Sequence, residues 1–306
     1  MLRAMEQGAV PMVAYKGNES SQILVKHGKE CTMEVSICIP AYNNAQHIGE
    51  TIESVLAQTF TDFELVIVDD NSKDNTVEVV QEYMKKDSRV VLYQNEKNLG
   101  MSGNWNRCVE MTKGEFVKLI CADDILMPDC LEKEVRAIKK AENISMVISD
   151  SQLIDNDKKK IGTFPRYHKA GLVGGAKIAK ASLIMINYFG MPCAVLFRRA
   201  CFDKVGGFDS NYKYILDFDL WMNMAGTGAV YVIKECLNGF RLRNDSNTGK
   251  VFSTEQKDYF NEHKYLVNKY KDKYGINKAE YGISLFSRWG RDVANGLFIK
   301  LKVRKK

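Results

Sequence analysis

Between residues 35 and 150, short apolar runs alternate with stretches whose apolar residues recur at helical spacing. Ile48, Ile52 and Val55 share one face of such a stretch, and Pro128 opens another, since proline suits the first turn of a helix. The apolar runs predict strands at 35–40, 64–69, 89–93, 115–121 and 145–149. This alternation predicts an α/β domain with a Rossmann-like, mostly parallel sheet flanked by helices.

The pattern becomes less regular after residue 150. Residues 155–190 contain many lysines and glycines without a clear period, and long irregular stretches of this kind are often functional. Further elements are predicted as a strand at 194–198, a helix at 217–225, strands at 229–233 and 237–242, and a helix at 254–274. The chain is therefore divided into an N-terminal extension (1–30), one α/β domain (31–245) and a helical, basic C-terminal segment (246–306).

Composition indicates an ordinary globular protein. Of the 306 residues, 45% are hydrophobic and 27% are charged. No apolar run approaches the roughly 20 residues that cross a bilayer, and residues 1–30 lack the continuous apolar stretch of a signal peptide. The eight cysteines have neither a paired framework nor metal-ligand spacing. We therefore expect reduced thiols and a cytoplasmic protein.

The formal net charge of +6 is mild and unevenly distributed. No recognisable nucleic-acid-binding module accompanies it, so nucleic acid is not expected as a partner. Residues 298–306 mix apolar and basic side chains. Such a tail can contact an anionic membrane surface, which would place the protein at the inner face of the cell membrane. A solvated chain end is the alternative interpretation.

Candidate ligand-binding residues, most of them polar, follow four of the predicted strands. In open α/β sheets, ligands bind beyond the carboxyl ends of the strands, so we expect these residues to share one edge. They are Pro40, Ala41, Tyr42 and Asn43 after the first strand, Asp70 after the second, Asn98 and Gly100 after the third, and Asp123 and Asp124 after the fourth. Carboxylate oxygens suit a hard divalent cation that bridges phosphates. The alternative is that the aspartates only cap helices.

Four of these side chains have an expected role. Tyr42 offers a ring on which a base can stack, and Asp70 can accept a hydrogen bond from a pyrimidine N–H. Asp123 can accept ribose hydroxyls while Asp124 binds the metal, and the two can share both roles. The turn after the first strand lacks the Gly-any-Gly-any-any-Gly fingerprint, which argues against a nicotinamide dehydrogenase.

Several segments between Val35 and Ser246 resemble the family-2 glycosyltransferases, nucleotide-sugar-dependent enzymes of the GT-A fold. The matching segments are 36–43, 58–60, 68–74, 95–100, 114–116, 123–128 and 205–209. The resemblance implies an inverting transfer of a sugar from a nucleoside diphosphate carrier, often UDP. The acceptor would be a hydroxyl of a glycan or of a lipid-linked molecule, as in the synthesis of bacterial surface polysaccharide or glycolipid.

The resemblance also implies a cofactor and a base. Mg²⁺ or Mn²⁺ would neutralise the departing diphosphate, and an aspartate before a Trp-bearing helix would deprotonate the acceptor. Asp217 falls at that position and Asp219 is the second candidate, in the segment Leu216-Asp217-Phe218-Asp219-Leu220-Trp221. The alternative role of Asp217 is a helix N-cap.

The chain departs from the family pattern at three positions. Cys121 stands where the first aspartate of the metal motif is expected, and a thiol does not easily replace a hard oxygen ligand. Leu216 stands where a glutamate is common, and Arg243 where a histidine is common, so that Arg243 can clamp the diphosphate instead. The changes at Cys121 and Leu216 favour the competing hypothesis of a module that binds nucleotide sugar without turnover.

Overall fold

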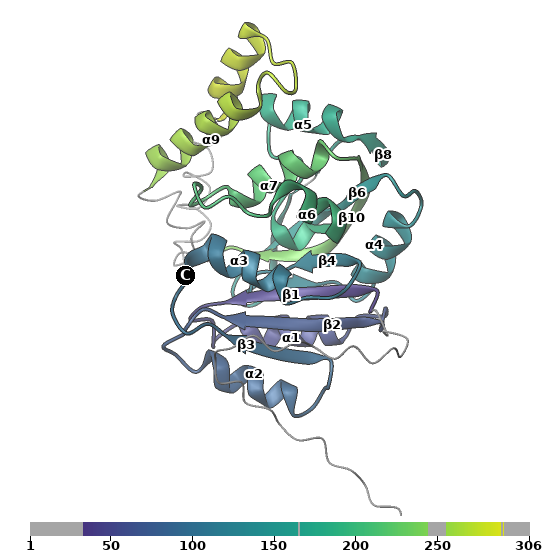
Figure 1. The fold of residues 1–306 in the computed structure, drawn as a ribbon, viewed down its shortest axis with the longest axis vertical. Coiled ribbons are helices and arrows are strands. Elements are labelled where there is room, and N and C mark those ends of the chain that lie inside the picture. Colours follow the sequence, from purple (N-terminus) through teal and green to yellow (C-terminus); the bar gives the residue numbers. More distant parts are fainter. Residues whose placement is uncertain (1–32, 165, 244–254, 289, 291–306) are drawn as a thin grey trace, which may run out of the picture. The chain divides into compact units, whose positions relative to one another are not determined.

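A mixed sheet forms the centre of the fold, with helices packed on both of its faces (Figure 1). The computed structural model describes residues 33–164, 166–243, 255–288 and 290. The predictions for the N-terminal extension and for the basic tail at 298–306 fall outside the described residues. Within the described part of the chain, no helix is long and apolar enough to cross a membrane.

The first half of the sheet is parallel, as the alternating pattern predicts. Its strands lie in the order β3-β2-β1-β4. Ala41, the last residue of β1, is aligned with Asp69, the last residue of β2, so the two strands end together. The strands are β1 (Val35–Ala41), β2 (Phe63–Asp69), β3 (Val90–Gln94) and β4 (Phe116–Leu119). The helices between and after them are α1 (Ile48–Leu56), α2 (Thr76–Met84), α3 (Gly100–Glu110) and α4 (Cys130–Ile138).

The second half of the sheet is mixed. β9 (Val195–Arg198) lies antiparallel between β4 and β6 (Ile144–Ile154), and β10 (Ala229–Arg241) runs parallel to β6. Two strands were expected where β10 is continuous, because a register shift between Ile233 and Cys236 interrupts the alternation of its side chains. Three short antiparallel strands complete the sheet, namely β5 (Ile125–Leu126), β7 (Lys160–Phe164) and β8 (Gly171–Gly174).

Alternation along the central strands divides the interior into two cores. Val35, Ile37 and Ile39 of β1 face the core that α1, α2 and α4 cover. Cys38 of the same strand faces the other core, which contains Trp105 of α3 together with residues of the later helices. Those helices are α5 (Gly175–Ile184), α6 (Arg199–Val205), α7 (Leu216–Ala225) and α9 (Gln256–Tyr270). The short 3-10 helix η1 (Pro192–Ala194) contributes Cys193 to the first core.

α9 packs against α7 and so reaches the part of the domain that carries the candidate base. Leu266 and Val267 of α9 are fully buried in the same core as Trp221 of α7. Beyond the end of α9, the hydroxyl of Tyr274 donates to the backbone carbonyl of Met222 at 2.5 Å. The segment from α9 to Tyr274 therefore packs behind α7.

Candidate functional site

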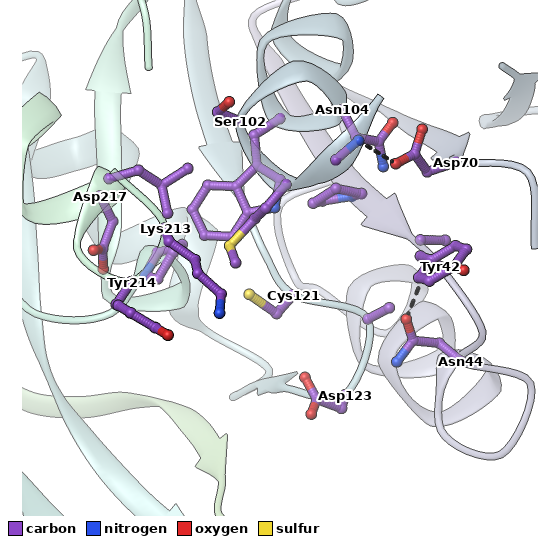
Figure 2. Close-up of a pocket in the computed structure, with 18 of the residues that line it drawn as sticks. Tyr42, Asn44, Asp70, Ser102, Asn104, Cys121, Asp123, Lys213, Tyr214 and Asp217 are labelled. Carbon is purple, nitrogen blue, oxygen red and sulfur yellow. Dashed lines mark hydrogen bonds between the residues drawn. The ribbon is translucent and has the colours of Figure 1, made fainter. Parts of the chain in front are cut away.

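A cleft of about 860 Å³ lies beyond the carboxyl ends of the parallel strands. The expected site residues line it, with the exception of Asp124. They are Pro40, Ala41, Tyr42, Asn43, Asp70, Asn98, Gly100, Asp123, Asp217 and Arg243. Figure 2 shows Tyr42 and Asp70 on one side of this cleft, Asp217 on the other, and Cys121 and Asp123 between them. Residues that are far apart in sequence therefore meet in one space.

The loop after β1 is fixed by side chains of the loop after β2. The backbone N–H of Asn43 donates to Ser72 Oγ at 2.9 Å, and Asn43 Oδ1 accepts the N–H of Lys73 at 2.7 Å. Asn43 has a positive φ of 52°, which asparagine tolerates better than most residues. This turn presents the ring of Tyr42 at the cleft with 47% of its surface exposed. An exposed tyrosine ring in that place can stack on a flat ligand.

Asp70 is almost completely buried and holds the loop that follows β3. Its Oδ1 accepts the backbone N–H of Leu99 at 2.8 Å and the side-chain N–H of Asn95 at 2.9 Å, and its Oδ2 accepts the N–H of Gly100 at 3.0 Å. Asn98 supports the same loop by donating to the backbone carbonyl of Asp70 at 3.1 Å. Oδ1 already accepts two hydrogen bonds, whereas Oδ2 accepts one and keeps a lone pair for a ligand N–H.

Asp123 lies between the two sides of the cleft and is held by two arginines. Arg243 Nε donates to Asp123 Oδ2 at 3.0 Å, and the two side chains are 14% and 15% exposed. Arg241 Nε donates to the backbone carbonyl of Asp123 at 2.7 Å and also pairs with Glu50 at 2.6 Å. Arg243 thus places a positive charge next to the carboxylate of Asp123. The expected diphosphate would bind beside both groups.

The carboxylate of Asp124 does not reach the cleft. The side chain is fully buried, and its Oδ1 accepts the backbone N–H of Arg241 at 2.9 Å, which ties the turn after β4 to the end of β10. Burial raises the pKa of Asp124, and the nearby negative charge of Asp123 raises it further. The fold encloses the carboxylate of Asp124, whose expected role as a metal ligand stays a prediction, and Asp123 is the aspartate of this pair that lines the cleft.

The donor set of the cleft decides which metal site it could form. Within the described ranges, no group of three or more His, Cys, Asp or Glu side chains is arranged to hold an ion. Cys121 lines the cleft, but its sulfur is a soft donor. Mg²⁺ is commonly bound by one or two carboxylates together with substrate phosphates and water. Asp123 fits that requirement, so the residues present suit a metal that arrives with a diphosphate.

Asp217 lies in the first turn of α7 and faces the cleft. Burial raises the pKa of its carboxyl from 3.8 to about 7, against the opposing effect of a hydrogen bond from the N–H of Phe218, which is 2.7 Å from Asp217 Oδ1. The cation of Arg166 also opposes the rise. A carboxylate whose pKa lies near neutrality can accept a proton at physiological pH and release it again.

Asp219, the second candidate, lies on a different face of α7. Its side chain is 1% exposed, and its Oδ1 accepts from Lys269 Nζ at 2.8 Å and from the hydroxyl of Tyr270 at 3.0 Å. It therefore helps to attach α9. Asp217 is not the N-cap of α7 either, because the cap position is Ile215. Of the two aspartates, only Asp217 faces the cleft.

The cleft also contains residues that the sequence patterns did not identify. Lys213 and Tyr214 precede α7, and Tyr259 belongs to α9. Figure 2 shows Lys213 and Tyr214 on the same side of the cleft as Asp217. The rings of Tyr214 and Tyr259 meet edge to face with centroids 6.3 Å apart. Aromatic residues before and within a helix carry no signal of their own that separates a cleft wall from a core.

Comparison with known proteins identifies the family and the fold. The model of glycosyl transferase family 2 matches residues 36–206, more than half of the chain. An uncharacterized glycosyltransferase of Methanocaldococcus jannaschii is 34% identical over 217 residues, covering 70% of this chain and 72% of its own. Chondroitin synthase of Escherichia coli is 28% identical over 252 residues, which cover 81% of this chain but only 34% of that protein.

Two solved structures share the arrangement of elements. S. aureus TarS 1–349 in complex with UDP-GlcNAc has a TM-score of 0.66 at 19% identity, covering 89% of this chain and 76% of its own. The mannosyltransferase PcManGT of Pyrobaculum calidifontis, in complex with GDP-Man and Mn²⁺, has a TM-score of 0.61 at 14% identity, covering 86% and 75%. Both likenesses show the GT-A fold. With the family match and the cleft at the strand ends, they lead to one conclusion: the chain belongs to glycosyl transferase family 2 and is an enzyme that transfers a sugar from a nucleotide sugar.

Proposed function

We propose that the protein transfers a sugar from a UDP-sugar, with inversion, to a hydroxyl of a glycan or lipid-linked acceptor in the synthesis of a surface polysaccharide or glycolipid. The observation that carries this proposal is the position of Asp217. Its carboxyl, with a pKa of about 7, lines the same cleft as Tyr42, Asp70 and Asp123. A base and a nucleotide-binding edge that share one cleft can bring an acceptor to a bound donor.

The nucleotide would occupy the edge formed by the loops after β1, β2 and β3. Tyr42 would stack on the base, and Asp70 would accept a base N–H through the remaining lone pair of Oδ2. UDP is preferred as the carrier because TarS, whose fold this chain shares, was solved with UDP and with UDP-GlcNAc. The sugar itself would lie near Cys121, between the nucleotide edge and Asp217.

The diphosphate would meet Asp123 and Arg243. Arg243 would contribute a positive charge to the leaving group, and Asp123 would hold Mg²⁺ or Mn²⁺ in company with the phosphate oxygens. When bound, such an ion supplies Lewis-acid stabilisation of the departing diphosphate. PcManGT was solved in complex with GDP-Man and Mn²⁺, which supports this assignment.

Asp217 would act as the general base. It would take the proton of the acceptor hydroxyl while that oxygen bonds to the anomeric carbon, and the bond from that carbon to the diphosphate oxygen would break on the opposite side. One displacement of this kind inverts the anomeric centre. The acceptor would lie against Lys213, Tyr214 and Tyr259, which line the cleft on the side of Asp217.

A second function has specific support. A module that binds nucleotide sugar without turnover would explain why the cleft has Cys121 in place of a carboxylate. Leu216 is 1% exposed, so it contributes a buried apolar contact rather than a charge beside Asp217. Both departures weaken the polar shell that a transferase of this family uses, while neither touches the edge expected to hold the nucleotide.

Turnover separates the two functions. The intact chain is incubated with a panel of UDP-sugars and GDP-mannose, with and without Mn²⁺, and the released nucleoside diphosphate is measured. The same donors are tested for a rise in melting temperature, because a ligand of the native state stabilises it. Donor-dependent release that Asp203→Asn retains and Asp217→Asn loses supports the transferase; Asp203 is an exposed residue of α6. Stabilisation by a donor with no release under any condition supports the binding module.

The acceptor also bears on location. We propose a cytoplasmic enzyme that works at the inner face of the cell membrane, since a lipid-linked acceptor would be presented there. The basic residues 298–306 support contact with anionic lipid. Co-sedimentation of the intact chain with vesicles of anionic lipid, compared with neutral vesicles, tests the contact. Equal recovery with both kinds of vesicle contradicts it.

A further inference from the structure

A glutamate of α9 is bonded to the backbone just before the helix that carries Asp217. Glu262 Oε1 accepts the N–H of Lys213 at 2.7 Å, and Oε2 accepts the N–H of Tyr214 at 2.9 Å and of Ile215 at 3.2 Å. Three consecutive backbone N–H groups therefore donate to one carboxylate, which lies 47–49 residues away in sequence. Hydrogen bonds to an ionised acceptor are stronger than neutral ones.

These three residues lead directly into α7. Ile215 is the N-cap residue of that helix. Its apolar side chain makes no capping hydrogen bond to the backbone N–H groups of the first turn. N–H groups at a helix start lack partners within the helix, and a negative charge there also suits the helix dipole. From outside the helix, Glu262 supplies an acceptor for the N–H of the cap residue Ile215 and places a carboxylate near the start of α7. It thus fixes the path of the chain two residues before Asp217.

A second glutamate on the same side of α9 holds the side chains of this segment. Glu255 Oε2, at the start of α9, accepts the hydroxyl of Tyr214 at 2.5 Å and lies 3.4 Å from Lys213 Nζ. The two glutamates are seven residues apart, close to two helical turns, so they face the same way. Lys213 and Tyr214 line the cleft beside Asp217. α9 therefore sets both the backbone and the side chains of this wall.

The attachment of α9 does not depend on Glu262. Leu266, Val267 and Tyr270 bury the following part of the helix, with exposures of 0%, 0% and 3%. Lys269 adds ion pairs to Asp209 and Asp219 at 3.1 and 2.8 Å. Loss of the Glu262 carboxylate should release the segment before α7 while the helix stays docked.

We propose that Glu262 is a positioning residue, which acts through residues 213–215 to hold Asp217 in reach of the acceptor hydroxyl. This inference rests on the proposed function, in which Asp217 is the base. It concerns a part of the chain beyond the family match, which ends at residue 206. Asp217 in α7 and Glu262 in α9 both lie beyond that segment, whereas Asp70 and Asp123 lie within it.

The test compares Glu262→Ala and Glu262→Gln with Asp258→Ala, which removes an exposed carboxylate from the same helix. Small displacements of a reacting group can cost on the order of 10²-fold in rate. We expect Glu262→Ala to lower kcat by about 10- to 100-fold, with the donor KM and the affinity for UDP within about twofold of wild type. Glu262→Gln keeps one strong acceptor and should lose less, and Asp258→Ala should match wild type.

Amide hydrogen exchange supplies a readout that does not need turnover. Exchange at 213–215 should be faster in Glu262→Ala than in Asp258→Ala, while exchange in α9 itself stays unchanged. Wild-type kcat in Glu262→Ala overturns the proposal, as does a loss of UDP affinity in step with kcat, which would indicate a general structural role. Unchanged exchange at 213–215 overturns it by itself. If Glu262→Ala does not fold, the same comparisons in Glu262→Gln decide. Absence of transfer in the wild-type chain refutes the proposed function instead.

Discussion

Replacing Asp217 with asparagine should abolish transfer and at the same time stabilise the folded chain. Asparagine keeps an oxygen that can accept the N–H of Phe218, now 2.7 Å away, so the change removes mainly the charge. Loss of a general base typically lowers the rate by about 10²- to 10⁴-fold. A general base buried in a partly desolvated site should lower the free energy of unfolding when it is ionised, while the reaction still requires it.

The size of the stabilisation follows from the pKa. Burial raises the pKa of Asp217 from 3.8 to about 7. One pKa unit corresponds to about 1.4 kcal/mol, so ionising this group in the fold costs at most about 4 kcal/mol. The side chain is partly exposed to the cleft, and solvent screening lowers the expected cost to about 2 kcal/mol.

The effect should depend on pH in one direction. Below about pH 4 the carboxyl is protonated in the folded and in the unfolded chain, so the free energy of unfolding carries no penalty. As pH rises through the folded pKa of about 7, the folded chain must give up a proton that it binds more tightly than the unfolded chain does. Stability from this group is therefore lost with rising pH. The gain of Asp217→Asn should be largest above pH 7 and small near pH 4.

Two measurements test this prediction on one preparation. Urea unfolding at pH 5 and pH 8 gives the difference in the free energy of unfolding between variant and wild type at each pH. Release of UDP at saturating donor and acceptor gives the rate. A stabilisation that is equal at both pH values, or a destabilisation at pH 8, would refute the raised pKa. Wild-type release in Asp217→Asn would show that another group is the base.

The remaining predictions concern groups around the cleft and in the core. Arg166→Met removes a buried cation that lowers the pKa of Asp217, so the acid limb of the kcat/KM profile should move to higher pH, and an unmoved limb contradicts the assignment. Asp123→Asn should raise the Mn²⁺ concentration for half-maximal UDP release by about tenfold or more, and an unchanged Mn²⁺ titration contradicts the ligand. Glu134→Gln leaves the fully buried ammonium of Lys118, now 2.7 Å from its partner, without a counter-charge, and urea unfolding should show a loss of about 3–5 kcal/mol. Lys118→Met with Glu134→Leu should recover most of that loss, and a double variant as unstable as the single one contradicts this account.

The parallel half of the sheet could be predicted from the sequence because its signals are local. β1 and β2 are short apolar runs that end in polar residues, and those ends determine where a ligand can bind. The sequence therefore predicted that Tyr42, Asp70 and Asp123 share one edge of the sheet, and all three line the cleft. Asp217 was proposed as the base through the resemblance of its segment to a family pattern, since periodicity alone does not distinguish a base from a cap.

The rest depended on contacts between distant parts of the chain. Asp123 and Asp124 are adjacent and chemically identical, yet the turn after β4 sends one carboxylate into the cleft and the other onto the N–H of Arg241. The short strands β5, β7 and β8 exist through pairing with β6 and β10, so their own residues carry little signal. Glu262 meets residues 213–215 only because α9 folds back on α7. The sequence by itself determined which chemistry the strand ends offer, and tertiary structure decided which side chains face it, because orientation is set by packing and not by residue type.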